Sequence, residues 1–102
     1  MDHNLIKNID KTLLHMNICE DLNKMFEIKN KRYNDSFSKS FNEYGLTMSC
    51  IRLDDKLSRF KALSKDKTLD DQKEESIKDT LKDLANYAIM TLIELERIDP
   101  ND

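Results

Sequence analysis

The stretch EESIKDTLKDLANYAIMTLIEL, residues 74–95, is the longest run with helical periodicity in the chain, and it decides the fold. At about 100° per residue, a polar stripe follows one side of this predicted helix and consists of Glu75, Asp79, Asp83 and Asn86. The apolar residues gather on the opposite side, which predicts the face that docks on the core: Ile77, Leu81, Leu84, Ala85, Ala88, Leu92 and Leu95.

The same helix predicts an assembly of subunits. Its polar stripe continues into Met90 and Ile93, so its second half is apolar nearly all round. A chain of 102 residues has little with which to cover two apolar faces of one helix. We therefore expect a homo-oligomer, a dimer or higher, that assembles through the long C-terminal helix.

Composition limits the class of protein. A chain of 102 residues forms one domain, residues 1–102, with a modest core, and the single Gly and single Pro indicate an all-α protein. The net charge of −3 comes from interleaved signs, so we expect no binding to duplex nucleic acid. Cys19 and Cys50 stand apart, as free thiols do in a reducing cytoplasm. Without a signal peptide or a long apolar run, we expect a cytoplasmic protein that does not contact membranes.

Three more helices are predicted, which makes the expected fold a small all-α bundle of about four helices. The first spans about residues 3–15, with an apolar side of Leu5, Ile6, Ile9 and Leu13. The second spans about residues 17–33, with an apolar side of Ile18, Leu22, Met25, Phe26 and Tyr33. The third spans about residues 46–63, with an apolar side of Leu46, Ser49, Cys50, Leu53, Leu57 and Phe60.

The connections between the helices carry their own signals. Residues 64–72 predict an exposed connector, in which Thr68 or Asp70 caps the long helix, and Pro100 marks the end of that helix. Gly45, the only glycine, predicts a backbone position with positive φ just before the third helix.

Residues 34–45, NDSFSKSFNEYG, break the helical periodicity but contain three aromatic residues. In one interpretation Phe37 and Phe41 pin a loop or helical turn to the core. In the other, a loop carrying Phe37 and Tyr44 stacks on a base or closes over a ligand. Lys29 also has two interpretations, because a lysine within an apolar stripe either extends to solvent or meets an anion.

A basic stripe on the third helix, formed by Arg52, Lys56 and Arg59, is the counterpart of the acidic stripe on the last helix. The two stripes form ion pairs across a helix interface, or they flank one cleft. In a cleft, the cations would hold phosphate oxygens, while the carboxylates would hold Mg²⁺ or hydrogen-bond a ribose or base.

These residues resemble a known family. The segments FEIKNKRYNDSFSKSFNEYG, IRLDDKLSRFKAL and EESIKDTLKDLANYAIMTLIEL are similar to the prokaryotic and phage proteins with a nucleotide-modification-associated domain. The resemblance runs from Phe26 to Leu95 and implies an α-helical fold with a nucleotide-related role.

The segment ESIKDTLKDLANYA also resembles the metal-binding helix of MazG-type all-α nucleoside-triphosphate pyrophosphohydrolases, which are Mg²⁺-dependent homo-oligomers. Those enzymes supply more glutamates from an earlier helix, where this chain has Lys29. One row of carboxylates is a poor two-metal site. The departure therefore favours binding of a nucleotide over its hydrolysis.

The function we expect is that of a phage-encoded cytoplasmic protein that sequesters a phosphorylated nucleotide at or near a subunit interface. In one form of this hypothesis the nucleotide is a cyclic immune signal, and the protein would then be an anti-defence factor. The expected ligand-binding residues are Lys29, Tyr33, Phe37, Tyr44, Arg52, Lys56, Arg59, Asp83 and Asn86. No cofactor is required unless the protein is an enzyme.

Two alternatives stay open. The first is a Mg²⁺-dependent nucleotide pyrophosphohydrolase, with Glu75 and Asp79 as metal ligands. The second is a structural or protein-interaction module in which the charged stripes form only ion pairs. No other chemistry is expected, because His15 has no partner at ligand spacing and neither cysteine is placed beside a histidine.

Overall fold

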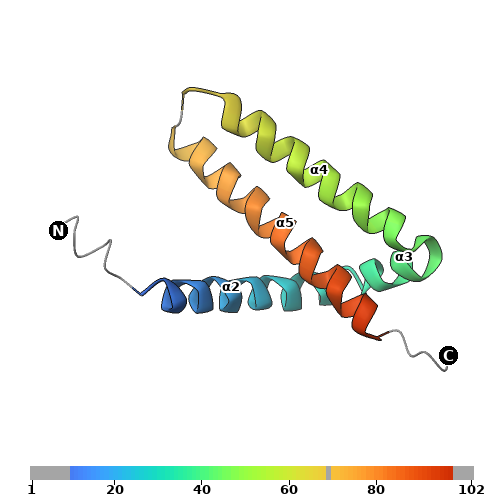
Figure 1. Ribbon diagram of the computed structural model, residues 1–102. Coiled ribbons are helices and arrows are strands. Elements are labelled where there is room, and N and C mark those ends of the chain that lie inside the picture. Colours follow the sequence, from blue (N-terminus) through green and yellow to red (C-terminus); the bar gives the residue numbers. More distant parts are fainter. Residues whose placement is uncertain (1–9, 69, 98–102) are drawn as a thin grey trace.

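The computed structural model describes residues 10–68 and 70–97, and these residues form helices joined by short connections (Figure 1). The helices are α2 (Lys11–Arg32), α3 (Ser36–Tyr44), α4 (Leu46–Lys65) and α5 (Asp71–Arg97). The predicted all-α bundle of about four helices is therefore confirmed. Within the described ranges, none of the helices combines the length and the apolar character needed to cross a bilayer.

α2 differs from the prediction of two helices with a break near residue 16. It runs without interruption from Lys11, because no glycine or proline lies between the two predicted segments. Asp10 caps it, and its carboxylate accepts a hydrogen bond of 2.9 Å from the Thr12 N–H. The predicted residues 3–9, with His3, Leu5, Ile6 and Ile9, lie outside the described part of the chain, as does the predicted end at Pro100.

α4 and α5 form a long antiparallel hairpin, and α2 crosses the C-terminal half of α5 (Figure 1). Two contacts fix the register of the hairpin. The Thr91 and Ser49 hydroxyls are hydrogen-bonded at 3.0 Å, and the Arg59 Nε–H donates to the Thr80 hydroxyl at 3.2 Å. The hairpin and α2 point in different directions away from their crossing, and α3 lies beside that crossing (Figure 1).

Two tight turns with positive φ join the first helices. Asn34 and Asp35 both have φ of 54°, a region that Asn and Asp tolerate better than other non-glycine residues. Gly45, between α3 and α4, has φ of 68° and ψ of −153°, which confirms the predicted positive φ. Before α5, the Asp70 carboxylate accepts a hydrogen bond of 2.8 Å from the Lys73 N–H, which confirms Asp70 as the cap.

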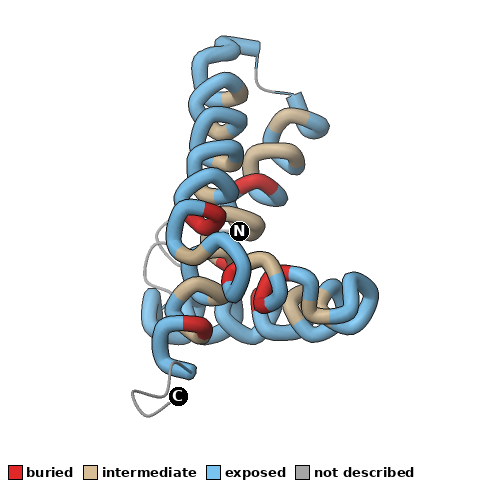
Figure 2. The backbone as a smooth tube through the Cα atoms, turned by 90° about the vertical axis from the view of Figure 1, so that its right-hand side faces the viewer, coloured by how far each residue is buried: buried red, intermediate tan, exposed pale blue. Residues whose placement is uncertain are grey.

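The core is small. Its buried cluster consists of Phe37, Phe41 and Met48, and Tyr87 and Met90 pack against it from α5. The interpretation in which Phe37 and Phe41 pin residues 34–45 to the core is confirmed, and most of this segment forms the helix α3. Most of the described residues are exposed, and the buried residues lie on the sides where helices meet (Figure 2).

α5 turns the opposite way from the prediction. Four residues of its predicted core face are exposed, namely Leu81, Ala88, Leu92 and Leu95. The side that carries Asn86 and Met90 instead faces α2, α3 and α4. The predicted orientation is wrong because the polar groups on the inward side all find hydrogen-bond partners, so their burial is tolerated.

α4 shows a smaller difference of the same kind. Its buried residues are Met48 and Ser49, and Lys56 is half-buried beside them. Three members of its predicted apolar side, Leu46, Cys50 and Leu57, are exposed. In both helices of the hairpin, the apolar stripe is thus displaced from the side that packs within one chain.

Candidate functional site

A cavity of about 410 Å³ lies where the four helices converge. Seven of the nine residues predicted to bind a ligand line it: Lys29 and Tyr33 from α2 and the following turn, Phe37 from α3, Arg52 and Lys56 from α4, and Asp83 and Asn86 from α5. Residues far apart in the sequence thus share one hollow. The arrangement favours the cleft interpretation of the two charged stripes.

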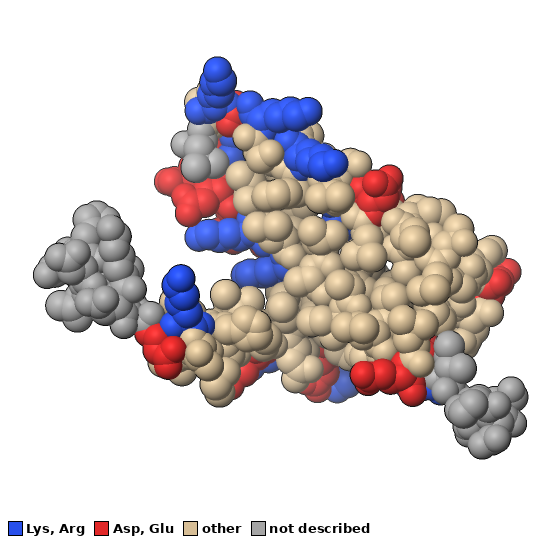
Figure 3. Space-filling model, in the orientation of Figure 1, with Lys and Arg blue, Asp and Glu red and all other residues tan. Residues whose placement is uncertain are grey.

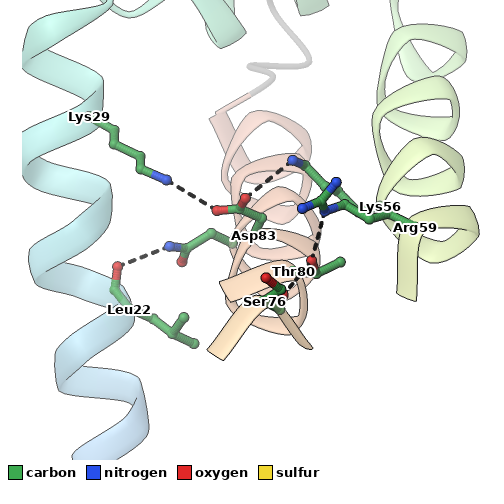
Figure 4. Close-up of polar contacts among 8 residues, drawn as sticks. Leu22, Lys29, Lys56, Arg59, Ser76, Thr80 and Asp83 are labelled. Carbon is green, nitrogen blue, oxygen red and sulfur yellow. Dashed lines mark hydrogen bonds and ion pairs between the residues drawn. The ribbon is translucent and has the colours of Figure 1, made fainter. Parts of the chain in front are cut away.

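Asp83 is the centre of the charged contacts in this cavity. The Lys29 Nζ donates to its Oδ1 at 3.1 Å from α2, and the Lys56 Nζ lies 3.2 Å from its Oδ2 on the side of α4 (Figure 4). All three side chains are partly exposed. Of the two interpretations of Lys29, the structure shows the one in which the lysine meets an anion, here a carboxylate.

Arg52 differs from the two lysines. In the described part of the chain its guanidinium forms no ion pair, although it lines the same cavity. An arginine stays charged at any pH of interest and offers a planar set of donors that matches a phosphate or carboxylate. Three cations therefore face one carboxylate in the lining, which leaves the cavity positively charged.

Neutral groups complete the lining. The Asn86 side chain is buried, and its amide donates to the Leu22 carbonyl oxygen at 3.2 Å, which joins α5 to α2. The rings of Phe37 and Tyr87 are stacked, with centroids 5.9 Å apart and planes inclined by 24°. Tyr33 is 58% exposed, so its ring is the lining aromatic most open to a ligand.

The other predicted site residues lie outside the cavity lining. Tyr44 is 63% exposed on α3, and Arg59 bonds to Thr80 in the contact between α4 and α5. Glu75 and Asp79 are exposed along the first half of α5. Within residues 10–68 and 70–97, no three His, Cys, Asp or Glu side chains come close enough together to hold a metal ion.

In the alternative interpretation, the two stripes only form ion pairs with each other. One contact in the structure agrees with this interpretation. Among the described residues Lys56 pairs with Asp83, whereas neither Glu75 nor Asp79 has a basic partner. The stripe on α5 therefore divides into an exposed first half and a second half that enters the cavity.

Sequence reasoning missed a buried polar cluster beside the cavity. Glu94 is only 6% exposed, the Ser38 hydroxyl donates to its carboxylate, and the Arg97 Nη1 lies 3.4 Å from the same oxygen. A second hollow of about 130 Å³ borders this cluster. The one available signal was the i, i+3 spacing of Glu94 and Arg97 on the predicted helix, since Ser38 has no local sequence signature.

The expectation that neither cysteine lies beside a histidine is wrong. The Cys19 Sγ lies 3.6 Å from the His15 Nδ1, one helical turn away on the exposed part of α2. The spacing i, i+4 was the signal, because it places both side chains on one face of a continuous helix. The prediction of a helix end near residue 15 assigns His15 and Cys19 to different helices, so it does not place the two side chains on one face.

The sequence model of the family described as nucleotide modification associated domain 1 matches residues 29–95. The matched range contains all seven predicted residues that line the cavity. No curated protein and no solved structure matches the chain.

Proposed function

The chain belongs to the nucleotide modification associated domain 1 family, and we propose that it binds a phosphorylated nucleotide in the cavity between its helices without turning it over. The observation that carries the proposal is the convergence of Lys29, Arg52 and Lys56 on one hollow beside an exposed tyrosine ring. The volume of about 410 Å³ falls within the range of about 300–1,000 Å³ that small-molecule sites occupy.

Each group in the lining has a role in this proposal. The two lysines and Arg52 hold phosphate oxygens through charge-assisted hydrogen bonds. Tyr33 stacks on the base, since its ring is exposed at the cavity. Asp83 accepts hydrogen bonds from the ribose or the base, and the amide of Asn86 fixes the helix that carries it.

Arg52 is the principal phosphate ligand in this proposal. A phosphate that approaches Lys29 or Lys56 competes with the carboxylate of Asp83, which already contacts both. Arg52 faces no such competition in the described part of the chain, and its planar donors match a phosphate bidentately. Replacing it removes a ligand contact without breaking an ion pair of the free protein.

The proposal has a biological form that rests on analogy. A phage-encoded protein of this kind would sequester a cyclic nucleotide immune signal in the host cytoplasm as an anti-defence factor. The proteins in this analogy are small helical oligomers, so we propose that this chain also forms a homo-oligomer. Fold-level likeness alone does not decide function, and the ligand must be identified directly.

The test is to incubate the purified protein with nucleoside triphosphates, cyclic dinucleotides and cyclic ADP-ribose isomers, with and without Mg²⁺. The protein is then denatured, and the released molecules are separated by chromatography. We expect one ligand to be depleted from solution and recovered intact. Conversion to product only with Mg²⁺ would instead establish the pyrophosphohydrolase, with Glu75 and Asp79 as candidate ligands. A panel left untouched would favour the structural module.

Arg52→Ala sharpens this test. The loss of one charge-assisted hydrogen bond of about 1.5–3 kcal/mol should weaken ligand binding by about 10- to 100-fold, with the thermal unfolding of the free protein unchanged. Lys65→Ala, at the exposed end of the same helix, is the matched control and should bind normally. Equal binding by both variants would remove Arg52 from the site.

A further inference from the structure

The α4–α5 hairpin carries an apolar face on the side away from α2. On α5, residues with alternating spacings of four and three follow one line, and they are Leu81, Ala85, Ala88, Leu92 and Leu95. This is the spacing of the a and d positions in a helix that packs along its length against other helices. Leu81, Leu92 and Leu95 are 40%, 58% and 42% exposed.

α4 carries a stripe of the same kind. Leu46, Cys50, Leu53, Leu57 and Phe60 have the same spacings of four and three residues. Leu46 and Leu57 are 52% and 39% exposed, and Cys50 is exposed as a free thiol. No charged residue interrupts either stripe, although 36% of the residues in the chain are charged.

The two stripes lie on the same side of the hairpin. On α5, at about 100° per residue, the line of Thr80 and Thr91, which contacts α4, falls between the cavity-lining Asp83 and the apolar stripe. On α4, Ser49 likewise falls between the cavity-lining side and its stripe. Figure 3 shows the resulting uncharged surface over α4 and α5, with charged side chains at its margins.

We infer that this face binds the same face of a second copy of the chain. A two-fold axis brings identical patches together, and two antiparallel hairpins with such stripes complete a four-helix bundle. The second copy is the occupant with two stripes of matching length and spacing, and the small residues Cys50, Ala85 and Ala88 allow the helices to approach closely.

The sparse core of a single chain supports this occupant. Among the described residues four hydrophobic side chains are buried, whereas fourteen large hydrophobic side chains are exposed, and five of the fourteen lie on this face: Leu46, Leu57, Leu81, Leu92 and Leu95. Each stripe extends over fifteen residues, about 21 Å, and two adjacent helices are about 20 Å wide. The apolar face of the hairpin is therefore about as wide as it is long. A dimer would place this surface in a second core. The cavity lies on the other side of the hairpin, so the inference does not depend on the proposed ligand.

The test is sedimentation velocity of the whole chain over a range of concentrations, for wild type and two variants. Wild type should sediment with at least twice the 12.1 kDa mass of one chain. Leu92→Glu should sediment as one chain, with its helical circular dichroism retained. Ile28→Glu is the matched control, since both residues are 58% exposed, but Ile28 lies on α2. A wild-type monomer, or dissociation by Ile28→Glu and not by Leu92→Glu, would overturn the inference.

Thiol alkylation of the unmodified protein gives a second test that does not rely on a variant folding. In a single chain both Cys19 and Cys50 are exposed, but Cys50 lies on the proposed interface. At high protein concentration, we expect Cys19 to react at least ten times faster than Cys50, and dilution should make the two rates converge. Equal rates at every concentration would contradict the inference.

Discussion

α5 turns its polar face, with Asp83 and Asn86, toward α2 and the cavity, while its apolar face, with Leu81 and Leu92, is exposed. On the inward face each buried polar atom of the described residues has a hydrogen-bond partner. The outward face offers hydrocarbon at helix-packing spacing. In a chain with a small core, an apolar face therefore marks a contact between helices, but it does not tell whether the two helices belong to one chain.

The largest effect should come from the core that anchors the inward face. Phe41→Ala deletes a ring that is 8% exposed, so unfolding in urea should show a loss of about 3–5 kcal/mol. Tyr44→Ala, on the same helix, removes a ring that is 63% exposed and should change stability by less than about 0.5 kcal/mol. Similar losses in the two variants would mean that α3 does not pack as described.

A smaller effect is expected from the polar contact between α5 and α2. Asn86→Ala removes the amide that donates to the Leu22 carbonyl oxygen, so the free energy of unfolding should fall by about 1–3 kcal/mol. Glu75→Ala removes an exposed group at the start of the same polar stripe and is the control. If Asn86→Ala proved as neutral as Glu75→Ala, the contact between Asn86 and Leu22 would not hold α5 to α2.

The smallest effect concerns the connector at the far end of the hairpin. The side-chain hydrogen bond from Lys73, followed by the backbone N–H of Thr68, lowers the pKa of Asp66 below its ordinary value of 3.8. Because the pKa is depressed in the folded state, the contact stabilises the fold above the ordinary pKa, and this stabilisation is lost as pH falls through the folded value.

Wild type should therefore lose slightly more stability than Asp66→Asn when the pH is lowered through this range. Thermal unfolding of both proteins between about pH 5 and pH 2 measures the difference. Parallel pH profiles would show that the exposed contact between Asp66 and Lys73 contributes nothing.

Much of the fold was predictable from local signals. The all-α class, the bounds of α4, the positive φ of Gly45 and the cap at Asp70 all follow from composition, periodicity and end signals. The direction in which α5 faces was not predictable in this way. Periodicity identifies an apolar stripe, but it does not tell whether the same chain or another copy covers it.

The candidate site shows the same division. Charge and aromatic patterns indicated Lys29, Arg52 and Asp83, which lie together in the cavity. The patterns could not separate them from Arg59 or Tyr44, which differ only in where the helices meet. Contacts between Ser38 and Glu94, 56 residues apart, have no sequence signal, because they depend on how α3 crosses α5.

We propose that the two sides of the α4–α5 hairpin bind different partners, a nucleotide on the cavity side and a second copy on the outer side. Native mass spectrometry with the ligand found in the panel measures both at once, because each mass gives the number of chains and of bound nucleotides. We predict that Arg52→Ala keeps the number of chains and loses the nucleotide, and that Leu92→Glu becomes a single chain that keeps it. If each variant lost both partners together, the claim of two separate sides would be contradicted.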